Sequence, residues 1–137
     1  MIALAPNPLN NAAKPISSDA LTIREQWWAQ LLDKYEPSFA SLIIACNDAF
    51  YRYDIFTEMP FAYDMELYDE YMNEAVALAL KLSQSLTFLD KQKICVLVTE
   101  VANKFFDSPR GLHIEHDFLK EISEVYQVYY NVKHTKE

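Results

Sequence analysis

Apolar residues recur along most of this chain at intervals of three or four positions, which is the spacing of one face of an α-helix. The clearest run follows Pro37, and its apolar positions are Phe39, Leu42, Ile43, Cys46, Ala49, Phe50 and Tyr53. Proline suits the first turn of a helix, where its missing N–H has no intrahelical partner to lose. The pattern therefore predicts a helix that begins at Pro37, buries this face and is broken by residues 57–60.

Four more segments show the same period. We expect helices at residues 18–34, 62–83 and 115–132, and another that opens near Thr87 and extends to Phe105. Candidate capping residues stand at two of the starts: Ser17, Ser18 and Asp19 before the first helix, and Thr87 with Asp90 before the fourth. Residues 107–111 form the clearest turn signal in the chain.

Glycine is almost absent, since Gly111 is the single glycine among 137 residues. Tight hairpins, phosphate-binding loops and nucleophile elbows all need glycine, so the composition favours packed helices without a cofactor or a catalytic nucleophile. Residues 1–17 contain several prolines and no helical period, which predicts an extended or flexible arm. We expect an all-α protein, a single-domain antiparallel bundle of four or five helices at residues 18–137.

Cysteine and tryptophan add little chemistry. Cys46 and Cys95 both lie within apolar helical patterns, and we expect them to be reduced and buried. Trp27 and Trp28 are adjacent, and consecutive helical side chains point about 100° apart. We therefore expect one indole in the core and the other at its margin.

The net charge of −8 is concentrated in one segment. Residues 63–74 hold five acidic residues and no basic one, whereas the chain after residue 74 is balanced. Binding to nucleic acid depends chiefly on lysine and arginine, so direct nucleic-acid binding is not expected. There is no stretch long enough to span a membrane and no basic, apolar leader, so we expect a cytoplasmic protein, in the producing cell or in a host.

The acidic segment is the main candidate for a partner-binding surface. In the expected helix, Glu66, Glu70 and Glu74 are four residues apart and would form one stripe, with Asp69 and Asn73 beside it. Tyr63 would flank the start of this stripe. Carboxylates at that spacing repel each other, so a basic partner would explain them. The alternative is that the tyrosines are core residues and the acids form a solvated face.

An aromatic turn just upstream could extend this surface. A helix hides only one side, so Tyr51, Phe56 and Phe61 are candidates for exposed contact residues with an acidic rim. Alternatively, the turn folds back and closes one end of the bundle.

The one cluster with metal-ligand residues is His113, His116 and Asp117, which could share a face of a helix. It lacks the Glu-x-x-His and His-Glu-x-x-His patterns of known helical metal sites. A pair of surface histidines at a helix start explains it more simply.

These features favour a non-catalytic protein-binding module. An acidic helical protein of this size could inhibit a partner by covering a basic, nucleic-acid-handling surface, in the manner of immunity proteins or phage anti-defence proteins. One alternative is a structural or adaptor subunit, or a homodimer, held by aromatic surface. Another is a metal-dependent hydrolase or oxidase at the histidine cluster.

Overall fold

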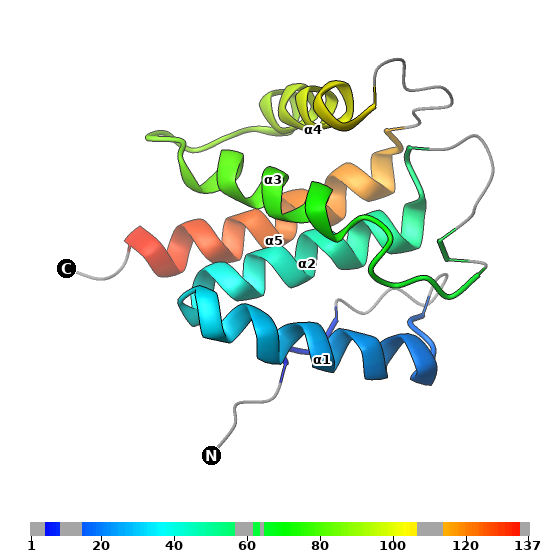
Figure 1. Cartoon of the computed structure of the whole chain (residues 1–137). Helices are drawn as coiled ribbons and strands as arrows, with labels where there is room; N and C mark the ends of the chain where they lie inside the picture. The colour runs from blue at the N-terminus through cyan, green and yellow to red at the C-terminus, as the bar shows by residue number, and fades with distance from the viewer. Residues whose placement is uncertain (1–4, 9–14, 57–61, 64, 107–113, 135–137) are drawn as a thin grey trace.

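The computed structural model describes residues 5–8, 15–56, 62–63, 65–106 and 114–134. Within these ranges the protein contains five helices and no strand (Figure 1). The helices are α1 (Ser18–Lys34), α2 (Pro37–Tyr53), α3 (Met72–Ser83), α4 (Lys91–Phe105) and α5 (His116–His134). The predicted all-α class is confirmed. None of the helices in the described part of the chain is both long and apolar enough to cross a bilayer.

Local capping sets most of the helix boundaries. The Ser17 hydroxyl accepts a hydrogen bond of 3.2 Å from the Ala20 N–H, as expected for the start of α1. Pro37 occupies the first turn of α2. Asp90 caps α4 by accepting a 2.9 Å hydrogen bond from the Lys93 N–H, so this helix begins after Asp90 and not at Thr87.

Helix α2 is the centre of the fold. It packs against α1, α3 and α5, and α4 in turn packs against α3 and α5. Figure 1 shows α2 crossing the middle of the molecule between these neighbours. Phe50 of α2 stacks on Phe118 of α5 with 5.5 Å between ring centroids, and both are fully buried. Burial on several sides explains why α2 contributes so many of the core residues.

Helix α3 begins ten residues later than the periodicity predicts. Residues 62–63 and 65–71 form turns, and the predicted helix over 62–83 is wrong for this part. Glu66 has a φ of 55°, which a right-handed helix does not allow. The Leu67 N–H instead donates to the Ala62 carbonyl at 2.8 Å.

The described parts of the N-terminal seventeen residues lie against the helices. Residues 5–8 and 15–17 have no regular secondary structure. Ala5 and Ile16 nevertheless pack against the core, and the Pro15 carbonyl accepts a 2.6 Å hydrogen bond from the Tyr63 hydroxyl. The predicted turn at 107–111 lies outside the described residues.

Candidate functional site

The acidic residues of 62–74 do not form a helical stripe. Glu66, Asp69 and Glu70 are exposed in the turns before α3, whereas Asn73 and Glu74 lie in the first turn of α3, where Asn73 is exposed and Glu74 is only 8% exposed. The expectation of an exposed stripe that includes Glu74 is therefore wrong. We call residues 62–63 and 65–71 the acidic segment.

Asp54 ties the acidic segment to the end of α2. Its Oδ1 accepts hydrogen bonds from the Ala62 N–H at 3.1 Å and from the Tyr71 hydroxyl at 2.7 Å, and its Oδ2 accepts from the Tyr63 N–H at 3.1 Å. Asp54 follows α2 in the left-handed conformation, with φ and ψ both 47°. Aspartate tolerates this region better than most residues, and the chain turns there so that one buried carboxylate binds both ends of the segment.

Three further hydrogen bonds hold the middle of the acidic segment. Asn47 Nδ2 donates to the Tyr68 carbonyl at 2.8 Å, and the Tyr68 hydroxyl donates to Asp48 Oδ1 at 2.6 Å. On the α1 side, Trp27 Nε1 donates to Asp69 Oδ2 at 3.0 Å. The segment lacks regular secondary structure, yet Asn47 and Asp54 bind its backbone and Trp27 of α1 binds the Asp69 side chain.

The aromatic turn is largely internal. Tyr51 is 1% exposed and Phe56 is 4% exposed, so the expectation that these two side chains lie on the surface is wrong. Tyr51 packs against Tyr63 and Tyr68 with centroid distances of 5.2 and 5.4 Å, and Phe56 packs against Tyr71 at 5.1 Å. These rings fill the space beneath the acidic segment. Phe61 lies outside the described residues.

The exposed carboxylates of the acidic segment are not neutralised by described basic residues. The ion pairs among those residues join Arg24 to Asp48, Arg52 to Glu121 and Lys81 to Glu100. Burial raises the pKa of Tyr51, and the nearby charge of Glu66 adds to the effect. Burial likewise raises the pKa of Glu74. The exposed negative charge of the segment thus resides on Glu66, Asp69 and Glu70, and Met65 stands 64% exposed beside them.

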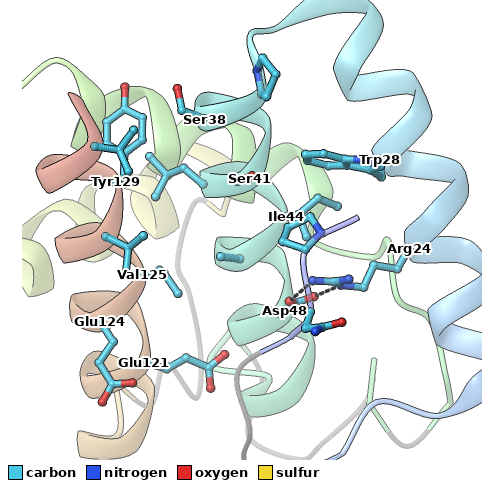
Figure 2. Close-up of a pocket in the computed structure, with 17 residues that line it drawn as sticks. Arg24, Trp28, Ser38, Ser41, Ile44, Asp48, Glu121, Glu124, Val125 and Tyr129 are labelled. Carbon is cyan, nitrogen blue, oxygen red and sulfur yellow. Dashed lines mark hydrogen bonds and ion pairs between the residues drawn. The ribbon is translucent and has the colours of Figure 1, made fainter. Parts of the chain in front are cut away.

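A cavity of about 720 Å³ lies between α1, α2 and α5 (Figure 2). Its floor is α2, its walls are α1 and α5, and Pro6 and Asn7 lie along one side; we call it the α1/α5 cavity. The sequence interpretation missed it. The available signal was Ser38, Ser41 and Ala45, small residues on one face of α2 that leave room above the floor.

Two buried ion pairs involve residues that line this cavity. Arg24 donates from Nε and Nη2 to the two oxygens of Asp48, both at 2.9 Å. Burial favours a lower pKa for Arg24, but the hydrogen bond and charge of Asp48 outweigh it, so that the pKa is raised. Arg52, which does not line the cavity, donates from Nη1 to Glu121 Oε2 at 2.8 Å, and burial raises the pKa of Glu121 despite this partner. Figure 2 shows Glu121 reaching from α5 toward the side of the cavity that holds Asp48.

The remaining sequence candidates show no assembled site. His116 and Asp117 are exposed at the start of α5, and His113 lies outside the described residues. Within the described ranges, histidine, cysteine and acidic side chains form no group of three or more that could hold a metal. Cys46 is a buried free thiol and Cys95 is a partly buried one. Trp28 is in the core and Trp27 is at its margin, which confirms the prediction for this pair.

Comparisons with protein-family models, with curated proteins and with solved structures found no match.

Proposed function

We propose that this protein is a non-catalytic protein-binding module whose acidic segment docks on a basic surface of a partner protein. The observation that carries the proposal is the anchoring of exposed carboxylates on a fixed, non-helical backbone. Asp54 alone accepts three hydrogen bonds from the segment. Binding loops held in place by a rigid scaffold are a common way for proteins to present contact residues.

The anchoring matters because the loss of conformational freedom in a loop opposes association. A loop that is already ordered loses less entropy on binding than a flexible one. Glu66 also occupies the left-handed region at an exposed position, and a strained residue of this kind often belongs to a functional surface. Met65 and Glu66 together offer an apolar contact next to a carboxylate.

Charge complementarity indicates the kind of partner. The exposed carboxylates of the acidic segment form no ion pair among the described residues, and such carboxylates attract lysine and arginine on another molecule and speed its approach. Proteins that handle nucleic acid carry such basic surfaces, so an inhibitor that covers one of them is the function we favour. Immunity proteins and phage anti-defence proteins are analogies of physical type for this proposal.

The test compares two charge reversals of equal size. Glu66→Lys with Glu70→Lys reverses the acidic segment, and Asp33→Lys with Glu36→Lys reverses exposed acids around the junction of α1 and α2. Wild type and both variants, each tagged, are used to capture proteins at low salt from the native host. A partner retained by wild type and by the control pair, but lost with the segment variant, supports the proposal.

Kinetics with that purified partner then give the quantitative test. Reversal of the segment should weaken binding by about tenfold or more, mainly through a slower association rate. The association rate of wild type should fall steeply with ionic strength, because salt screens exposed charges. Equal affinity of the segment variant and wild type contradicts the proposal.

A second candidate, a homodimer or adaptor subunit, is favoured by an aromatic surface after α3. Leu86 is 94% exposed, and Phe88 packs against Tyr126 and Tyr130 at the surface of α5. Light scattering of wild type and of Leu86→Ser with Phe88→Ser tests this candidate. A dimer that dissociates in the variant supports it, whereas a monomeric wild type at high concentration rules out the homodimer.

We extend the proposal to the architecture and the location. The contacts of α2 with three other helices support a single-domain antiparallel bundle at residues 18–137, preceded by an arm at residues 1–17. The proposed partner places the protein in the cytoplasm of the producing cell or of a host. Size-exclusion chromatography of a chain that starts at residue 18 tests whether the arm is dispensable for folding.

A further inference from the structure

We propose that the α1/α5 cavity binds a small amphipathic cation, with the apolar body of the ligand inside the cavity and its ammonium group toward α5. This site is separate from the acidic segment and does not depend on the proposed function.

The size and lining of the cavity point to a small organic molecule. Its volume of about 720 Å³ falls in the range of roughly 300–1,000 Å³ that is typical of small-molecule pockets. The walls are mainly apolar, with Trp28 on the α1 side and Val125 and Tyr129 on the α5 side. Burial of an apolar ligand against such walls is favourable because it removes apolar surface from water.

Small residues on the floor create the space. Ser41 and Ala45 lie on α2 between the two walls, and both are only partly buried although α2 is the central helix. At the mouth, Val128 of α5 is 64% exposed. An exposed apolar side chain beside a hollow of this volume is expected where a ligand completes the packing.

The charges lining the cavity select a cation. Of the three lining carboxylates, Asp48 is paired with Arg24 and Glu121 is paired with Arg52, so the net negative charge of the lining comes from Glu124. Arg24 is already held by both oxygens of Asp48, so it is not available to an incoming anion. Glu124 is exposed at the cavity and forms no ion pair among the described residues, which leaves it to attract an ammonium group.

The N-terminal residues favour a small ligand over a helix of a partner protein. Pro6 and Asn7 are among the residues that line the cavity, so part of it is covered by the N-terminal residues of this chain. A partner helix laid along α2 meets this segment, whereas a compact ligand enters beside Val128 and Glu124. The apolar walls of Trp28, Val125 and Tyr129 therefore suit the alkyl body of a ligand, and the exposed carboxylate of Glu124 suits its ammonium group.

The experiment uses three probes with the same alkyl chain: octylammonium, octanoate and octanol, each below its micelle concentration. Binding to the full chain is measured by calorimetry and by chemical-shift changes in ¹H–¹⁵N spectra. Octylammonium should bind about tenfold more tightly than octanoate, with octanol between them, because the lining charge is net negative. The largest shifts should fall on Ser41, Ala45 and Val128. Equal affinity for the three probes, tighter binding of octanoate, or no binding of octylammonium overturns the proposal.

Two kinds of variant locate the binding. Ala45→Phe fills the floor and should abolish binding of octylammonium, and Ser41→Phe serves the same purpose if the first variant does not fold. Glu124→Gln should weaken octylammonium by about two- to fivefold, the range for an exposed charge pair, and leave octanol unchanged. Glu115→Gln is the matched control, with no effect expected. Binding that persists when the floor is filled in a folded variant, or shifts confined to the acidic segment, places the ligand elsewhere and overturns the proposal.

Discussion

The Tyr71 hydroxyl donates a 2.7 Å hydrogen bond to Asp54 Oδ1, so that the residue before α3 is joined to the residue that follows α2. The same carboxylate accepts hydrogen bonds from the backbone at Ala62 and Tyr63. One side chain thus closes the loop between two helices from both ends. The acidic segment owes its fixed position to this closure more than to any local preference of its own.

Removing the Asp54 carboxylate should loosen the acidic segment. Asp54→Gly keeps a residue that accepts the left-handed conformation but leaves three donors without their acceptor, at a cost of about 2–4 kcal/mol in the free energy of unfolding. Tyr71→Phe removes one donor and should cost about 1 kcal/mol. Urea denaturation measures both values. Hydrogen exchange at the amides of Ala62 and Tyr63 should quicken in Asp54→Gly, and unchanged exchange there contradicts the anchoring role.

The Arg24–Asp48 pair should show strong coupling because both groups are buried. Arg24→Met leaves an unpaired carboxylate in the interior and should destabilise the fold by about 3–5 kcal/mol. Arg24→Met combined with Asp48→Leu should lose less than the sum of the two single changes, with a coupling of about 1–3 kcal/mol. The double-mutant cycle is measured by urea denaturation.

The exposed pair of Lys81 and Glu100, with 3.2 Å between Nζ and Oε1, is the matched control for that cycle. Its coupling should stay below about 1 kcal/mol, because solvent screens the charges. Similar coupling energies for the two pairs contradict the view that burial determines the strength of the first.

The helices were readable from the sequence because their signals are local. Pro37, Ser17 and the apolar period mark α1 and α2 directly, and the predicted bounds of α1 agree with the structure. The start of α3 was not readable, because Tyr68 and Tyr71 satisfy a helical period and are also buried when they lie in turns. The hydrogen bonds that hold these turns involve Asn47 of α2 and Asp54 at its C-terminal end, which are distant in sequence from the turns.

Burial of Tyr51 depends on tertiary contacts that the helical period alone does not show. Tyr51 lies off the main apolar stripe of α2, and an amphipathic helix at a surface leaves such a position exposed. Helix α2 is instead central and is covered on several sides. A usable signal was the scarcity of charged residues along α2, where Asp48 and Arg52 prove to be buried and paired.

Truncation of neighbouring aromatic residues on α2 tests this central position. Phe50→Ala and Tyr51→Ala should each destabilise the protein by about 3–5 kcal/mol, since both side chains are fully packed. Leu86→Ala should change stability by less than about 0.5 kcal/mol, because Leu86 is 94% exposed. Thermal or urea unfolding of the three variants measures the differences. A small effect of Tyr51→Ala contradicts the burial of that ring and restores it as a surface residue.

The buried Glu74 makes a prediction about pH. Burial raises the pKa of Glu74 in the folded protein, with the charge of Glu70 adding to the effect. The folded state therefore binds this proton more tightly than the unfolded chain, and stability falls as pH rises from the ordinary glutamate pKa of about 4.3 through the raised value. Glu74→Gln cannot ionise, so it should be more stable than wild type at neutral pH, and its advantage should shrink as the pH is lowered below that window.

Urea denaturation of Glu74→Gln and wild type at several pH values measures the difference, with Glu25→Gln as an exposed control that should stay within about 0.5 kcal/mol of wild type. A variant that is less stable than wild type at neutral pH shows that the favourable effect of a carboxylate in the first turn of α3 outweighs the cost of its burial.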